Sequence, residues 1–181
     1  MKPKPHFLVL SAILTIIVAS CAPQQVHQTD KAKTETTPSE HTSGMEGMNA
    51  RGDKVMGFDH LKTTHHFCLF TYGGAIEIEA KDAKDAVTRH QIRRHLSRIA
   101  KMFSDGDFNS PMLIHGQTPS GVPTMQRLKG EIKYKFEETE RGGRVRISTS
   151  NPEGLASIHE FLRFQIKEHQ TGDITEVIQQ S

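Results

Sequence analysis

The sequence predicts an α+β fold: two strand–strand–helix units form a four-stranded antiparallel sheet, with the helices packed on one face. Two observations lead to this prediction. Apolar residues alternate with polar ones on both sides of Gly73-Gly74, and again around Gly142-Gly143. After each of these regions, apolar residues recur every three or four positions. The first period is typical of half-buried strands and the second of amphipathic helices.

The first unit consists of a hairpin over residues 64–80 and the helix that follows it. Two glycines at the turn supply the positive φ that two-residue hairpin loops require. Asp82 or Asp85 is expected to cap the helix, which ends within residues 104–107. Its apolar stripe contains Ile92, Leu96, Ile99 and Phe103.

The second unit repeats this order, with strands expected over residues 132–136 and 145–147. Asn151 and Pro152 form the pair of N-cap and first-turn residues that begins many helices. That helix is expected to end within residues 171–173. Its apolar stripe contains Leu155, Ile158, Leu162 and Ile166.

The connection between the units is less regular. Residues 111–115 are expected to form a short strand or edge segment, and residues 124–128 a short helix. A single folded domain is therefore expected over residues 56–175, followed by a tail of residues 176–181.

The N-terminal residues indicate a location. A short basic stretch precedes an apolar run over residues 7–19, which is too short to cross a ~30 Å hydrocarbon core but suits a signal peptide. The run ends in Val18-Ala19-Ser20-Cys21, which resembles the lipobox of bacterial lipoproteins. The resemblance implies that residues 1–20 are removed and that lipid on Cys21 anchors the protein to the cell envelope. Ala22 after the cysteine implies the outer membrane, facing the periplasm.

Residues 21–55 are predicted to form a disordered tether, because they are polar and lack apolar periodicity. The tether contains His41, Met45 and Met48. The Met-x-x-Met spacing supplies soft thioether ligands suited to Cu(I). The alternative interpretation is an accidental composition in a disordered tail.

The charge balance excludes one class of function. Without the signal peptide the chain has 21 basic and 21 acidic residues, so it cannot bind nucleic acid through net charge. The helix of the first unit nevertheless has a basic exposed side, which is either a solvated face or a contact for anionic lipid or an envelope protein partner. This side contains Arg89, Arg93, Arg94, Arg98 and Lys101.

The two cysteines exclude a disulfide-rich scaffold. If lipid occupies Cys21, Cys68 is the only thiol and no intramolecular disulfide can form. Cys68 is then a buried inert side chain, a metal ligand or a site of intermolecular cross-linking.

Eleven histidines are the most unusual feature of the composition. The hairpin register places His65 at the edge of the core, and His66 and Cys68 on the opposite face. Converging neutral imidazoles are the usual ligands of zinc, copper or haem iron. The candidate ligands are His65, His66, His95, His115, His159 and His169. His27, His41 and His60 are expected to be dispensable, and for any single histidine the alternative is a hydrogen-bonded structural role.

The motifs of common enzymes do not occur: the sequence has no Gly-x-Ser-x-Gly elbow, no Gly-rich phosphate loop and no paired carboxylates. This observation favours a protein that is not an enzyme. Two functions follow from the sequence. One is a membrane-tethered envelope protein that binds copper, zinc or haem through clustered histidines, with copper favoured by the tether. The other is a non-catalytic interaction module with structural histidines.

The pattern of residues between Met56 and Asp173 resembles a family of secreted or lipid-anchored bacterial domains. The similarity lies in Met56-Gly57-Phe58-Asp59, Thr64-His65-His66-Phe67, Gly73-Gly74, Gly106-Asp107-Phe108, His115, Gly142-Gly143-Arg144-Val145, Ile158-His159-Glu160-Phe161-Leu162 and Gly172-Asp173. The resemblance implies a shared fold and an envelope location. A tail that contains His and Met often precedes the domain in this family, which fits copper handling. The family has no established activity, so the resemblance implies no catalytic residue.

Overall fold

The computed structural model describes residues 40–179 of the chain, and their side chains from Gly47 onward. The predicted signal peptide and the proposed lipid attachment at Cys21 lie outside the described residues. Within the described range, no helix has the length and apolar character needed to cross a membrane.

A four-stranded antiparallel sheet confirms the predicted α+β fold. Its strand order is β1-β2-β4-β3, so the two hairpins lie side by side and the strands β1 and β3 form the edges. The strands are β1 (Thr63–Phe70), β2 (Gly73–Ala80), β3 (Lys133–Glu138) and β4 (Gly142–Ser148).

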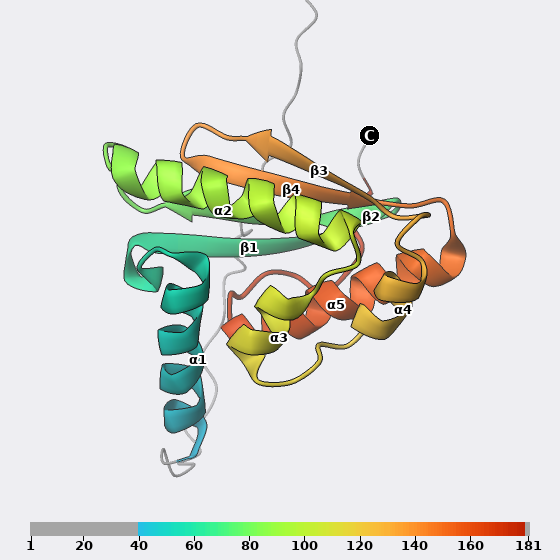
Figure 1. Ribbon diagram of the computed structural model, residues 1–181, viewed down its shortest axis with the longest axis horizontal. Coiled ribbons are helices and arrows are strands. Elements are labelled where there is room, and N and C mark those ends of the chain that lie inside the picture. Colours follow the sequence, from blue (N-terminus) through green and yellow to red (C-terminus); the bar gives the residue numbers. More distant parts are fainter. Residues whose placement is uncertain (1–39, 180–181) are drawn as a thin grey trace, which may run out of the picture.

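Both long helices pack on one face of the sheet (Figure 1). Helix α2 (Ala86–Ser104) follows the first hairpin but lies mainly over β3 and β4. Helix α5 (Pro152–His169) follows the second hairpin but lies along β1 and β2. Each helix therefore covers the hairpin of the other unit, and the core between them includes Leu96 and Phe161.

The predicted helix caps are confirmed, but the predicted position of the first hairpin turn is wrong. Gly73 and Gly74 are the first residues of β2, and the chain turns at Thr71 and Tyr72, so that Phe70 pairs with Gly73. Asp85, rather than Asp82, caps α2, and its carboxylate accepts a hydrogen bond from the Thr88 amide at 2.9 Å. Asn151 caps α5 through the amides of the next turn. Gly73, which has φ +146, begins β2, where a Cβ would lie 2.1 Å from the Ile147 carbonyl oxygen. That close approach explains why a glycine begins the strand.

The connection between the units differs from the prediction at residues 111–115. These residues belong to helix α3 (Asn109–His115), not to a strand. Pro111 lies in its first turn, where a missing amide costs little, and Gly116 ends the helix in the left-handed region with φ +66. The expected short helix at 124–128 is present as α4 (Val122–Arg127).

The predicted tether extends too far towards the domain. Residues of its C-terminal part form helix α1 (Glu40–Met56), which packs against α3 (Figure 1). Met48 is buried, and the Arg51 guanidinium Nε donates to the Ile114 carbonyl at 2.9 Å. Gly57, with φ +81, then turns the chain into the short 3₁₀ helix η1 (His60–Lys62).

The C-terminal segment also lies against the domain. The Asp173 carboxylate accepts hydrogen bonds from the His66 ring and from the Phe67 amide, each at 2.9 Å. Further on, the Ile178 amide donates to the Leu69 carbonyl at 2.8 Å and forms an isolated bridge with β1. Part of the predicted tail at 176–181 therefore pairs with β1, which is an edge strand.

Candidate functional site

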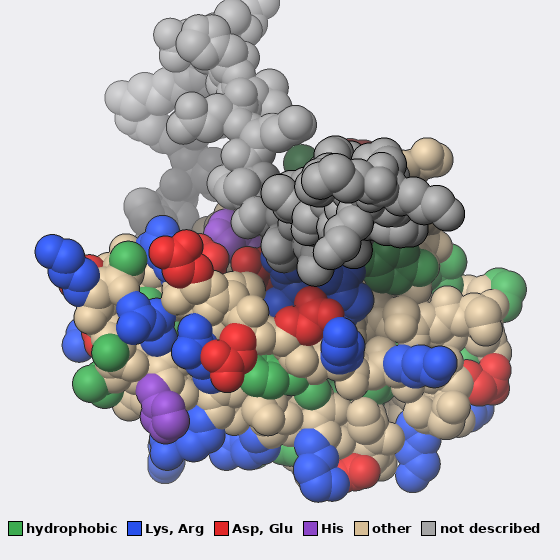
Figure 2. Space-filling view, turned by 90° about the horizontal axis from the view of Figure 1, so that it is seen from above, with side chains coloured by type: hydrophobic (Ala, Val, Ile, Leu, Met, Phe, Trp, Pro, Cys, Tyr) green, Lys and Arg blue, Asp and Glu red, His purple; other side chains and the backbone are tan. Residues whose placement is uncertain are grey.

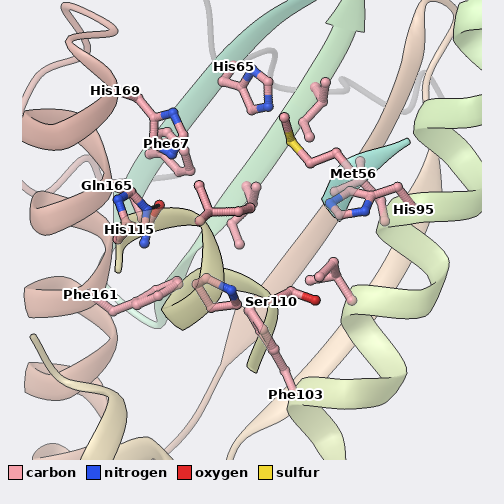
Figure 3. A pocket seen from close by; sticks show the side chains of 16 residues that line it. Met56, His65, Phe67, His95, Phe103, Ser110, His115, Phe161, Gln165 and His169 are labelled. Atoms are coloured by element: carbon pink, nitrogen blue, oxygen red, sulfur yellow. Dashed lines mark hydrogen bonds between the residues drawn. The ribbon is translucent and has the colours of Figure 1, made fainter. Parts of the chain in front are cut away.

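Four of the six candidate histidines surround one cavity of about 60 Å³ beneath the sheet (Figure 3). Its walls come from the inner faces of β1 and β2 and from α2, α3 and α5, and Met56 at the end of α1 adds a thioether. The remaining lining side chains are apolar, except for Ser110 and Gln165, and none is charged. The four histidines are His65, His95, His115 and His169.

Each of these histidines comes from a different element. His65 faces inward on β1, as predicted, and lies opposite Ile78, where a turn at Gly73-Gly74 would have placed Leu69. The shift of two residues leaves every side chain on its predicted face. His95 lies within the buried stripe of α2, where its ring contacts Phe58 edge-to-face at a centroid distance of 5.6 Å. His115 and His169 are the last residues of α3 and α5. The cavity therefore forms where the ends of two helices meet the sheet.

The rings of three histidines are in contact at one side of the cavity. His65 and His169 stack with their planes 9° apart and their centroids 5.6 Å apart. The His115 ring meets His169 edge-to-face at 5.1 Å. Figure 3 shows His115 and His169 on one wall and His95 on the opposite wall, with His65 above and the Met56 sulfur between.

The four imidazoles are neutral at pH 7. Burial, with a smaller contribution from the neighbouring histidines, lowers the pKa of His65 and of His169 to about 3. Burial also lowers the pKa of His95 to about 4, with the Arg98 charge as a smaller cause. Burial is likewise the main reason that the pKa of His115 lies below its usual value. A neutral ring has one nitrogen with a lone pair that can bind a metal. In His95 this nitrogen is Nδ1, which already accepts from the Arg98 guanidinium at 3.4 Å.

Two of these rings have an enclosed nitrogen with no hydrogen-bond partner among the described residues: Nε2 of His65 and Nδ1 of His115. His115 donates from Nε2 to the Gln165 side-chain oxygen at 3.0 Å, which leaves the lone pair on the unpartnered Nδ1. Buried polar atoms without partners are rare in native proteins. A ring held by a hydrogen bond at one nitrogen and open at the other has the arrangement typical of a metal ligand.

His159 and His66 lie outside this cavity. The buried His159 ring places Nε2 at 2.9 Å from the Phe70 carbonyl and 3.0 Å from the Gly73 carbonyl. It therefore ties α5 to the first hairpin turn, which is a structural role. His66 lies on the other face of β1, as predicted, and its hydrogen bond with Asp173 raises its pKa.

A second cavity, of about 280 Å³, lies beside the first, between α1 and the start of β1. Met56, His65, Ile114 and His169 line both cavities. The second cavity is also lined by Met48, His60, His66 and Lys81. Met56 was not predicted as a site residue. Met48 and Met56 lie about two helical turns apart, however, and this spacing places both along one side of a helix.

Among the described residues, one set of three or more His, Cys, Asp or Glu side chains brings its ligand atoms within 4.8 Å of one another: Asp53, Asp59 and His60. All three side chains are between 31% and 46% exposed, and their contacts have local explanations. Asp59 caps η1, and Asp53 accepts from both the amide and the ring of His60. The cavity histidines surround a space but do not form a closed set of three nitrogens at that distance.

The structure corrects the prediction for Cys68. Its side chain is 5% exposed and disulfide-bonded, so it is not the free thiol that the sequence analysis expected. The other cysteine of the chain, Cys21, lies outside the described residues.

The basic side of α2 is partly used within the fold. Arg93 donates to the carbonyls of Gly142 and Thr139 at 3.0 and 2.7 Å, and Arg98 donates to the Val55 carbonyl at 2.9 Å. On the face seen in Figure 2, Lys and Arg side chains prevail over Asp and Glu. The hydrogen bonds of Arg93 and Arg98 within the fold show that two of the five basic residues have a structural role.

Comparisons of the chain with protein-family models, with curated proteins and with solved structures found no match.

Proposed function

We propose that this protein is a cell-envelope protein that binds Cu(I) in the cavity beneath the sheet. The observation that carries the proposal is the composition of the cavity wall: four imidazoles and one thioether face a buried space that no charged side chain lines. Imidazole and thioether are neutral ligands, and thioether sulfur favours the soft ion Cu(I).

Charge favours Cu(I) over a dication. A Zn²⁺ ion in a wall without carboxylate or thiolate would keep its full charge in a medium of low dielectric, which is costly. Structural zinc sites also have four ligands in a tetrahedron, usually with cysteine or carboxylate among them. Cu(I) carries a single charge and accepts two or three ligands, so it matches neutral rings that do not form a closed set of three.

Size favours an ion over haem. A cavity of about 60 Å³ has room for roughly four to six water molecules, at about 10–15 Å³ for each. Sites for organic ligands have volumes of about 300–1,000 Å³. Haem would therefore require the surrounding elements to move apart, whereas one metal ion would not.

The contacts between the rings suggest which groups would coordinate the ion. His169 lies between His65 and His115, and both neighbours have an unpartnered nitrogen. We assign two of these three rings, together with the Met56 thioether, as the ligands of one ion, because the three rings do not bring three nitrogens within 4.8 Å of one another. His95 borders the cavity from the opposite wall, but its Nδ1 accepts from Arg98.

A titration of the purified protein with Cu(I) under anaerobic conditions tests the proposal, with a colorimetric Cu(I) chelator as competitor. We expect one tightly bound Cu(I) per chain. His65→Gln and His169→Gln should each weaken binding at least 100-fold while leaving the circular dichroism unchanged. His90→Gln is the matched control, because His90 is exposed on α2 and lines neither cavity.

A wild-type protein that takes up no Cu(I) in this assay would contradict the proposal. The cavity histidines would then be structural, and the interaction module would become the better hypothesis. Binding of Zn²⁺ but not Cu(I) would contradict the argument from charge.

A further inference from the structure

We infer that the second cavity is the uptake site through which Cu(I) reaches the cavity beneath the sheet, with Met48 and Met56 as its first ligands. This inference rests on the proposed function and adds a path and an order of ligand exchange.

The two cavities are adjacent and share potential ligands. Met56, His65 and His169 line both of them, so an ion held at these groups in the outer cavity is already in contact with the inner site. The outer cavity is the larger one, at about 280 Å³ against 60 Å³. A Cu(I) ion can therefore enter the outer cavity while it still carries some ligands of the molecule that delivers it. It exchanges these ligands before it reaches the inner cavity.

Met48 has a position that the core does not explain. It is 6% exposed, yet it does not belong to the apolar core beneath the sheet, because α1 packs mainly against α3 and η1. Its side chain lines the outer cavity together with Met56. Two thioethers from one helix thus border the space through which an ion would pass, and thioethers exchange Cu(I) without a change of protonation.

The two cavities differ in their polar surroundings. Lys81, His60 and His66 line the outer cavity, and the Nδ1 atoms of the two histidines lie at 2.9 Å from the carboxylates of Asp53 and Asp173. No charged side chain lines the inner cavity. An ion that passes from the outer to the inner cavity therefore leaves charged and hydrogen-bonded groups behind and is surrounded by neutral ligands.

The transfer is a ligand exchange and involves no redox step. Copper remains Cu(I) throughout, each thioether or imidazole donates one lone pair as a donor ligand leaves, and no proton has to move because the imidazoles are already neutral.

Stopped-flow measurement of Cu(I) transfer from a coloured chelator complex to the full chain tests the inference. Met48→Leu removes the thioether but conserves the side-chain volume. We expect it to slow the transfer at least 10-fold, while the equilibrium affinity for Cu(I) stays within about twofold of wild type. Met125→Leu is the matched control, since Met125 is fully buried and lines neither cavity, and it should transfer copper at the wild-type rate.

The possible failures are distinguishable. If Met48→Leu takes up Cu(I) as fast as wild type and with the same affinity, the uptake site is refuted and the proposed function stands. If Met48→Leu keeps its fold but loses equilibrium affinity, Met48 is a ligand of the final site, and the path is refuted. If the wild-type protein binds no Cu(I), the proposed function fails and the inference fails with it.

Discussion

Acidification should unfold the metal-free protein at a pH where few carboxylates have been protonated. The reason is that His65, His95 and His169 are buried as neutral rings, with pKa values lowered to about 3, 4 and 3. In the unfolded chain each ring has the ordinary pKa of about 6.5. Between pH 6.5 and 4, the unfolded state therefore binds more protons than the folded state. Stability must fall as the pH falls through this window.

The size of the effect follows from the shifts. As the pH falls, each of the three histidines lowers the free energy of unfolding by at most about 1.4 kcal/mol per pH unit. Between pH 6.5 and 4.5 this amounts to about 2 kcal/mol for each histidine. Together they remove about 6 kcal/mol, against a total stability of about 5–15 kcal/mol for a typical domain. His66 acts in the opposite sense. Its pKa is raised by Asp173, so its contribution is complete below the unfolded pKa and is lost as the pH rises through the folded pKa.

Urea denaturation of the metal-free protein at pH 7, 6, 5 and 4.5, followed by circular dichroism, measures this slope. His95→Gln should reduce the slope by about a third, because one proton fewer is taken up on unfolding, whereas His90→Gln at the exposed position should leave it unchanged. A stability that is constant from pH 6.5 to 4.5 would show that the rings protonate without unfolding. The assignment of neutral buried imidazoles would then be wrong.

Three further predictions concern the fold and the anchor. Gly121→Ala should destabilise the protein by about 2 kcal/mol or more in urea denaturation. The reason is that Gly121 has φ +79 and that a Cβ there would lie 2.1 Å from a carbonyl oxygen of α5. Gly130→Ala is the control and should be tolerated, because the space around Gly130 is open. His159→Phe should cost about 1–3 kcal/mol of stability through two carbonyls left without their donor, yet leave Cu(I) affinity unchanged. Mass spectrometry of the membrane fraction without reduction tests the predicted anchor. A chain that begins at a lipid-modified Cys21 would support it and would require Cys68 to pair with a cysteine of a second chain, since one sulfur cannot serve both bonds; an unmodified Cys21 would refute the anchor.

The sequence predicted the sheet and the two long helices because their signals are local. Alternation on both sides of a Gly-Gly pair defines the inward residues of each hairpin, and His65 faces inward as expected. The turn of the first hairpin nevertheless lies two residues earlier than predicted, so His65 and not Leu69 pairs with Ile78. The caps at Asp85 and Asn151 require only hydrogen bonds within one turn. Such features depend on neighbours in the chain, so periodicity and capping rules find them.

Helix α1 was missed because distant contacts stabilise it. It is buried at Met48 against α3 and is held by the Arg51 hydrogen bond to Ile114, a residue far away in the sequence. Its own sequence is rich in glycine and polar residues and predicts a tether. The short apolar run in α3 was also ambiguous, because a run of that length suits a strand as well as a buried helix.

The candidate histidines illustrate the same limit. His95 and His159 both lie in the apolar stripe of a long helix, and the sequence treats them alike. The structure separates them because the first hairpin turn presents two carbonyls to His159, whereas His95 borders the cavity and accepts from Arg98 at Nδ1. Only the tertiary packing decides which partner each buried imidazole finds.

The exchange of helices between the two units explains where the cavity lies. Because α5 crosses to the first hairpin, its C-terminal His169 reaches His65 on β1. In the second hairpin, Tyr134 occupies the position of His65 relative to the Gly-Gly pair and pairs with Ile147, just as His65 pairs with Ile78. Tyr134 is partly buried, contacts Phe103 and packs against the core, so its ring occupies the equivalent place in the second unit.

The second strand–strand–helix unit therefore packs tightly at this position, whereas the first unit borders a cavity. That difference arises from two segments outside the repeat, α1 and α3, which supply Met56 and His115 to the walls. A fold that needed only stability could close the first unit as it closes the second. The neutral histidines and the thioether that line the open half are therefore better explained as a ligand site than as core residues.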